Sequence, residues 1–162
     1  MEGHDETALI LRQLTDKHAI AAVLIRYATA LDTRDWELFR TCFTADAVAD
    51  YGALGGENEG LAAIEAVVKS LEGFDATQHL IGNIAVEIAG DGARATCYLQ
   101  AQHAARGAEG GECFTIAGTY RDRIVRTESG WRISHRELEV AWTDGNPRVL
   151  ELAAQRAPMA RG

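Results

Sequence analysis

Positive charge, paired cysteines and long apolar segments are all scarce in this sequence of 162 residues. It has 16 Lys and Arg residues against 24 Asp and Glu residues, which gives a formal net charge of −8. The basic residues do not cluster into a Lys- and Arg-rich segment. Because such a surface repels phosphate backbones, we expect no nucleic-acid partner. No apolar run approaches the roughly 18 residues of a membrane-spanning helix, and the acidic N-terminus lacks the features of a secretory signal. We therefore expect a cytoplasmic protein without a membrane partner.

Sequence motifs for metals, nucleotides and disulfides are missing as well. Cys42, Cys97 and Cys113 form no CxxC pair and have no zinc-type spacing, which argues against a disulfide framework or a structural metal site. The glycine-rich stretches 52–60 and 107–111 lack the GxGxxG and GxxxxGK(S/T) patterns of phosphate-binding loops. We therefore expect no metal and no other cofactor.

The sequence does contain the composition of one ordinary globular domain, with 47% hydrophobic and 25% charged residues. Residues 1–162 are predicted to form a single domain, with an N-terminal extension over 1–13 and a C-terminal tail over 148–162. The apolar patch 8–11 fits one or two helical turns that pack on the domain or on a neighbouring subunit. The tail after Pro147 fits one last helical turn.

The spacing of apolar residues changes along the chain from a helical period to a strand period. Three- and four-residue steps predict a helix that begins with Thr15 as N-cap and ends near Asp32. A short helix over 36–43, a strand over 47–51 and a helix over 61–71 follow. From residue 80 the alternation is that of long antiparallel strands. This order predicts an α+β fold in which a strongly curved, mostly antiparallel sheet wraps around the N-terminal helices.

Several short motifs resemble, in the same order, those of the SnoaL-like branch (polyketide cyclases and dehydratases) of the nuclear-transport-factor-like superfamily. They are Tyr27 followed by Asp32 and Asp35-Trp36, then TQHLIGN at 77–83, GTYRD at 118–122 and GWRI at 130–133. The resemblance implies a cone-shaped α+β barrel with a single apolar pocket for a small hydrophobic molecule. It also implies a homodimer or homotrimer, because an exposed sheet face in this fold usually pairs with a second copy.

Within that family the sequence is most similar to dehydratases and dehydrohalogenases, such as scytalone dehydratase and bile-acid 7α-dehydratase, which use a His–Asp pair as the base for an elimination. The matching positions here are His79 and Asp32, and Tyr27 matches a phenol of the bile-acid enzyme. Imidazole, with an ordinary pKa of roughly 6.5, suits the removal of a carbon-bound proton. A carboxylate on its other ring nitrogen would fix the tautomer, and the Tyr27 hydroxyl would donate to an enolate oxygen.

On spacing alone, each of these residues also fits a structural role. Asp32 lies at the edge of the apolar arc of its helix and fits a capping or solvated carboxylate, His79 fits a histidine bonded to backbone, and Tyr27 fits a packed core tyrosine. His103 shares the strand face of Leu99 and falls where scytalone dehydratase has a second histidine. It is therefore either the proton donor to the leaving hydroxyl or a core histidine.

Further residues are predicted to bind substrate, namely Tyr51, Asp50, Leu99, Phe114 and Trp36. Asp50 and Tyr51 end the predicted first strand near the pocket mouth, and alternation leaves open which of them points inward. His135 continues the alternation of the last strand, but a bulge would reverse its direction, because Leu138 has the opposite parity.

These observations predict a cofactor-independent lyase of the dehydratase type, which acts on a hydrophobic hydroxyketone of the steroid, polyketide or terpenoid kind. Two alternatives stay open. A ketosteroid-isomerase-like enzyme or a cyclase would use the same enolate without expelling a leaving group. A non-catalytic module would only bind a small molecule or assemble with other subunits.

Overall fold

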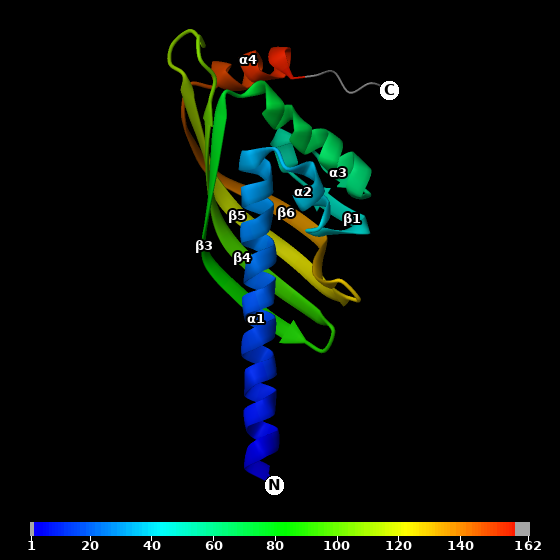
Figure 1. The fold of residues 1–162 in the computed structure, drawn as a ribbon. Coiled ribbons are helices and arrows are strands. Elements are labelled where there is room, and N and C mark those ends of the chain that lie inside the picture. Colours follow the sequence, from blue (N-terminus) through cyan, green and yellow to red (C-terminus); the bar gives the residue numbers. More distant parts are fainter. Residues whose placement is uncertain (1, 158–162) are drawn as a thin grey trace.

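The computed structural model describes residues 2–157, in which helices cover one face of a six-stranded curved sheet (Figure 1). In chain order the elements are α1 (Glu2–Thr33), α2 (Trp36–Arg40), β1 (Phe43–Asp50), the 3-10 helix η1 (Gly52–Leu54), β2 (Glu57–Glu59), α3 (Leu61–Val68), the 3-10 helix η2 (Lys69–Gly73), β3 (Ala76–Ala89), β4 (Gly92–Ala104), β5 (Cys113–Thr127), β6 (Gly130–Gly145) and α4 (Arg148–Arg156). None of the helices in this part of the chain combines the length and the apolar character that crossing a bilayer requires.

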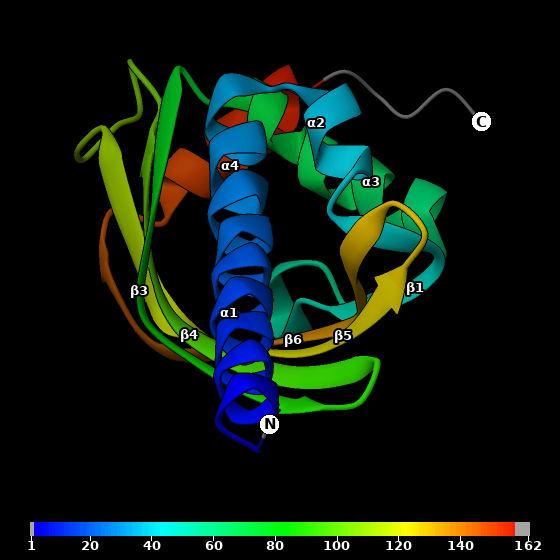
Figure 2. The ribbon, with the colours of Figure 1, turned by 60° about the horizontal axis from the view of Figure 1, so that its bottom comes forward.

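The sheet has the strand order β2-β1-β6-β5-β4-β3. Strands β3 to β6 form an antiparallel meander, whereas β1 pairs with β2 antiparallel and with β6 in parallel. The long strands curve around α1, so that the main core lies between the sheet and the helices (Figure 2). Within the described residues β2 and β3 are edge strands, and the sheet stays open. The predicted α+β fold, with a strongly curved and mostly antiparallel sheet around the N-terminal helices, is confirmed, but the sheet does not close into the barrel that the family resemblance implies.

Helix α1 begins well before the predicted N-cap. Its second half buries Ile20, Leu24 and Leu31 in the core, as the apolar spacing predicts. Its first half projects beyond the end of the sheet (Figure 1). The predicted helix start at Thr15 is wrong, because residues 5–14 include good helix formers without glycine or proline, and a single threonine does not stop a helix.

A bulge in β6 decides which of its residues point into the core. The strand pairs with β5 through Ile133 and next through His135, which leaves Ser134 as an extra residue. Buried positions therefore shift from Ile133 to Arg136 and Leu138. The bulge thus turns Leu138 toward the core, which is one of the two possibilities that the sequence left open. His135 is only half-buried as a result.

The chain after Pro147 forms α4, which is longer than the predicted single turn. Helix α4 buries Val149 and Ala153 and lies at the end of the sheet opposite the N-terminus (Figure 1). Gly73 permits this close packing, because a Cβ atom there would lie 2.0 Å from the carbonyl oxygen of Ala153. The second helix, in contrast, is shorter than predicted: α2 ends at Arg40, and β1 begins three residues later.

Candidate active site

A cavity of about 340 Å³ lies between the concave face of the sheet and the helical layer. This volume is near the small end of the usual range for small-molecule sites. Most of the lining side chains are apolar, and they come from α1, η1, α3, η2, the long strands and α4. Two imidazoles and three phenols are also among them, from His79, His103, Tyr27, Tyr51 and Tyr120. The cavity therefore combines apolar walls with a few groups that exchange or donate protons.

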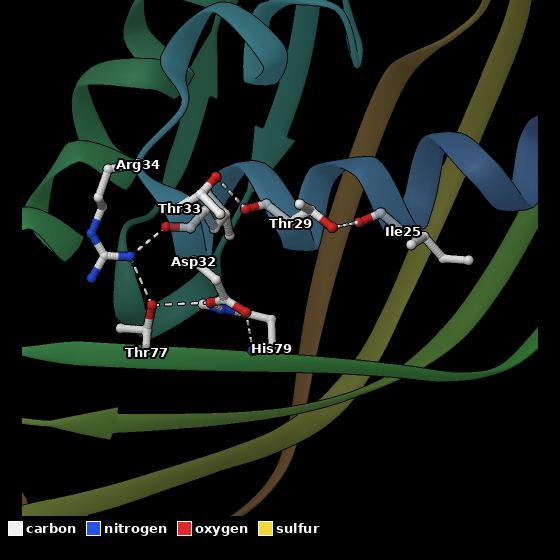
Figure 3. A network of polar contacts seen from close by, with 8 residues as sticks. Ile25, Thr29, Asp32, Thr33, Arg34, Thr77 and His79 are labelled. Carbon is white, nitrogen blue, oxygen red and sulfur yellow. Dashed lines mark hydrogen bonds and ion pairs between the residues drawn. The ribbon is translucent and has the colours of Figure 1, made fainter.

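The end of α1 and the start of β3 bring Asp32 and His79 together (Figure 3). Asp32 Oδ1 lies 2.6 Å from His79 Nδ1, and Asp32 Oδ2 accepts a hydrogen bond from the His79 backbone N–H at 2.8 Å. The Thr77 hydroxyl donates to Asp32 Oδ1 at 3.0 Å. The His79 side chain is only 5% exposed. Because the carboxylate occupies Nδ1, Nε2 is the ring nitrogen left for a molecule in the cavity.

The way in which α1 ends explains how Asp32 reaches β3. Arg34 adopts a positive φ of 58°. The backbone N–H of Asp35 donates a hydrogen bond to the carbonyl oxygen of Ala30 at 3.0 Å, as in a Schellman motif. The Arg34 guanidinium folds back and donates to the Thr77 hydroxyl at 2.8 Å (Figure 3). This turn fixes the last helical turn against the strand that carries His79.

Asp32 is ionised at neutral pH. Burial raises its pKa, but hydrogen bonds from the ring and the backbone N–H of His79 outweigh that effect and hold the pKa below its usual value. A charged carboxylate at Nδ1 fixes the tautomer of His79 and stabilises the imidazolium that forms when Nε2 takes a proton.

The phenols form a second polar group in the cavity. The hydroxyl oxygens of Tyr27 and Tyr51 lie 3.1 Å apart, and the rings of Tyr27 and Tyr120 meet edge to face. Burial raises the pKa of Tyr51 and Tyr120 well above the usual range, so both phenols keep their protons at neutral pH. Neutral phenols in a largely apolar cavity are suitable hydrogen-bond donors to a developing oxyanion.

A buried ion pair that the sequence pattern did not predict lies against two of the phenol rings. Arg136 and Asp122 form two hydrogen bonds of 2.7 Å, and both side chains are 0% exposed. The guanidinium carbon lies 4.1 Å from the ring centre of Tyr27 and 4.0 Å from that of Tyr120. One feature of the sequence could have indicated this pair. Asp122 lies two residues after Tyr120 in the same strand, so its side chain points to the same inward face, and a buried carboxylate needs a partner.

His103 lines the same cavity and stays neutral. Burial, together with the positive charge that His79 can carry, lowers the pKa of His103 to about 4. Its Nδ1 atom is buried without a hydrogen-bond partner among the described residues. Its ring packs against Phe74 and His79, with ring centres 4.9 and 5.8 Å away. A neutral imidazole at this position suits hydrogen bonding to a ligand better than transfer of a proton to it.

A model of the SnoaL-like domain matches residues 12–137. The chain belongs to the SnoaL-like domain family. A curated relative of this SnoaL-like domain, an uncharacterized protein from Mycobacterium tuberculosis, is 32% identical over 135 residues, which are 82% of this chain and 90% of the relative. A second relative, terrestric acid biosynthesis cluster protein E from Penicillium crustosum, is 34% identical over 145 residues, or 85% and 90% of the two chains.

Solved structures share the fold. A Kribbella flavida protein superimposes with a TM-score of 0.78 at 26% identity, over 87% of this chain and 98% of that one. A candidate scytalone dehydratase from Novosphingobium aromaticivorans gives 0.74 at 22% identity, over 82% and 88%. A hexachlorocyclohexane dehydrochlorinase gives 0.72 at 18% identity, over 83% and 90%. The last two likenesses concern the fold alone.

In this SnoaL-like domain, the predicted substrate-binding residues divide into two groups. Tyr51 and Leu99 line the cavity, and Tyr51 rather than Asp50 is the residue that points inward. Asp50, Trp36 and Phe114 are not among the lining residues.

Local contacts explain where these three side chains lie. Asp50 accepts a hydrogen bond from the N–H of Gly52 in the turn after β1. The indole of Trp36 donates to Glu72 at 2.7 Å near the surface. Phe114 packs in a separate apolar cluster that includes Val149 of α4. Across residues 5–157, no three His, Cys, Asp or Glu side chains gather as a metal site would require.

The low pKa of His103 in this SnoaL-like domain predicts a pH-dependent stability. Between pH 6.5 and about 4 the unfolded chain binds a proton at this residue and the folded chain does not. The free energy of unfolding should therefore fall as the pH is lowered through this range, by up to about 3 kcal/mol from this group. Urea unfolding at pH 7 and pH 4.5 should show a smaller difference for His103→Gln than for the wild type. The same substitution at the exposed His18 is the control, and an equal difference in all three proteins would contradict the prediction.

Proposed function

We propose that this protein is a cofactor-independent lyase that eliminates water from a hydrophobic hydroxyketone. One observation carries the proposal: an imidazole held by an ionised carboxylate shares a largely apolar cavity with three phenols. Elimination beside a carbonyl needs these two kinds of group, a base for a carbon-bound proton and donors for the enolate oxygen.

In the proposed reaction, His79 Nε2 takes the proton from the carbon next to the substrate carbonyl. The electron pair of that C–H bond moves toward the carbonyl oxygen, where the phenol hydroxyls of Tyr27 and Tyr51 stabilise the negative charge. When the carbonyl re-forms, the C–O bond to the β-hydroxyl breaks, and the leaving oxygen takes the proton back from His79. The products are an unsaturated ketone and water, and His79 returns to its starting state.

The relatives support this reaction class. The fold is shared with a candidate scytalone dehydratase and with a dehydrochlorinase, which by their names are enzymes of elimination reactions. A relative at 34% identity is named after a biosynthetic cluster, which favours a secondary metabolite as substrate. A cavity of about 340 Å³ favours a ketone of one or two rings over a full steroid.

Incubation of the purified protein with a panel of β-hydroxyketones tests the proposal. The panel should contain one-ring, two-ring and steroid members, and the products should be followed by the ultraviolet absorption of the conjugated ketone and by mass spectrometry. We expect loss of one water molecule from a one- or two-ring member. A product of unchanged mass would indicate an isomerase or cyclase that uses the same enolate, and tight binding without turnover would indicate a binding module.

A further inference from the structure

Arg136 is the one lysine or arginine that is buried among residues 5–157. It does not line the cavity, but its guanidinium carbon lies 4.1 Å from the ring centre of Tyr27 and 4.0 Å from that of Tyr120, which both do. Its Nε and Nη2 atoms donate to the two carboxylate oxygens of Asp122, and Nη1 has no hydrogen-bond partner among the described residues. The cation therefore acts on the cavity through the two phenol rings.

Stability does not explain why a charge occupies this position. A buried ion pair loses about as much in hydration as it gains from its own attraction, and apolar residues of similar volume replace such a pair at little cost. The aromatic surroundings of Arg136, which include Phe43 at 6.0 Å, would suit an apolar side chain as well. The phenols, in contrast, gain from the charge. A cation close to a phenol favours its ionised form, and so strengthens the hydrogen bond that its hydroxyl donates.

We propose that Arg136 is a positioning residue of the oxyanion site, whose charge strengthens the hydrogen bonds that the phenols donate to the enolate oxygen. This role rests on the proposed function, in which Tyr27 and Tyr51 stabilise that oxygen. Tyr27 is in direct contact with the guanidinium. The effect reaches Tyr51 because its hydroxyl oxygen lies 3.1 Å from that of Tyr27.

The charge of Arg136 opposes the effect of burial on the phenols. Burial and the neighbouring Tyr27 raise the pKa of Tyr51 and of Tyr120, and the charge of Arg136 acts in the opposite direction on both. Burial is the larger effect, so the phenols keep their protons at neutral pH, as hydrogen-bond donors must. Loss of the charge should therefore leave neutral phenols in place that donate weaker hydrogen bonds.

Neutral replacement of the ion pair tests this role in turnover. Asp122→Val/Arg136→Met removes both charges and leaves no lone charge in the core. We expect kcat for water elimination to fall about 10- to 50-fold, less than the about 10²–10³-fold that follows the loss of an oxyanion-hole donor. KM should stay within about threefold of wild type, because neither residue lines the cavity.

Two further variants distinguish the charge from the packing. Arg121→Gln/Glu139→Gln neutralises an exposed ion pair that joins the same two strands, and it should leave kcat unchanged. Asp122→Asn/Arg136→Gln keeps polar side chains at both buried positions without their charges. It should lower kcat as the apolar pair does, and it tests the role even if the apolar pair does not fold.

Binding of a naphthol measures the same electrostatic effect without turnover. The neutral and ionised forms of this two-ring phenol resemble an enol and an enolate, and they differ in absorption spectrum. A naphthol whose binding perturbs the His79 ring signals in proton NMR spectra should be added to each protein at one pH. We expect the ratio of ionised to neutral bound naphthol to be about tenfold higher in the wild type than in either neutral pair, the lower end of the usual effect of a nearby charge.

The two measurements distinguish failure of this role from failure of the lyase reaction. A wild type that eliminates no water, but ionises the bound naphthol more than the neutral pairs do, would contradict the reaction and support the effect of Arg136 on the cavity. Equal ratios in the wild type and both neutral pairs would overturn the role. So would a kcat within about threefold of wild type in the neutral pairs, or an equal fall of kcat in the variant of Arg121 and Glu139.

Discussion

Replacement of His79 by asparagine should lower kcat for water elimination by about 10²–10⁴-fold, the usual contribution of a general base. Asparagine keeps a donor near the position of Nδ1, where Asp32 binds, but it has no group that takes a proton at the position of Nε2. The free energy of unfolding should change by no more than about 1 kcal/mol, because the backbone bond from residue 79 to Asp32 remains. Steady-state kinetics on the best hydroxyketone of the panel, with urea unfolding in parallel, measure both quantities.

Asp32→Asn should also lower kcat, because a neutral amide no longer stabilises the imidazolium of His79. KM should change little in both variants, since neither replacement alters the apolar walls of the cavity. His135→Asn is the matched control, because this half-buried histidine is not among the lining residues and should leave kcat unchanged. A rate within threefold of wild type in the His79 variant would remove the proposed base from the mechanism.

The second large effect concerns stability. Asp122→Asn should lower the free energy of unfolding by about 3–5 kcal/mol, because it leaves the Arg136 charge fully buried without its counter-charge. Burial alone lowers the pKa of Arg136, and the carboxylate of Asp122 is the main group that reverses this. Urea denaturation at pH 7 measures the loss.

Two controls make this prediction specific. The pair Arg121–Glu139 joins the same two strands, but its side chains are 54% and 61% exposed. Glu139→Gln should therefore cost no more than about 1 kcal/mol. The double variant Asp122→Val/Arg136→Met should recover most of the lost stability, since apolar residues of similar combined volume replace a buried pair at little cost. A double variant as unstable as Asp122→Asn would show that burial of a lone charge is not the cause.

The sequence was sufficient to predict the architecture and the pairing of Asp32 with His79. Periods of 3.6 and 2 distinguish the helices from the strands, and the resemblance to SnoaL-like proteins selects one aspartate and one histidine that folding brings within 2.6 Å. Parity along a regular strand also places Leu99 and His103 correctly in the cavity wall.

Other features depend on tertiary contacts that no local pattern encodes. The bulge at Ser134 reverses which residues of β6 point toward the core. Alternation counted from Trp131 therefore does not predict that Arg136 is buried. Helix α4 forms because it can bury Val149 and Ala153 against elements distant in sequence, whereas its own residues predict only one turn. Phe114 has the inward parity but packs in a second apolar cluster with Val149 of α4, a contact that strand alternation does not encode.

Deuterium exchange measures the central claim most directly, that the Asp32–His79 pair removes a proton from carbon. A one- or two-ring ketone without a hydroxyl leaving group should be incubated with the protein in deuterated water and followed by proton NMR. We expect the wild type to exchange the protons next to the carbonyl and His79→Asn to do so at least 100-fold more slowly. Equal exchange rates for the two proteins, or no exchange of a ketone that demonstrably binds in the cavity, would contradict the claim.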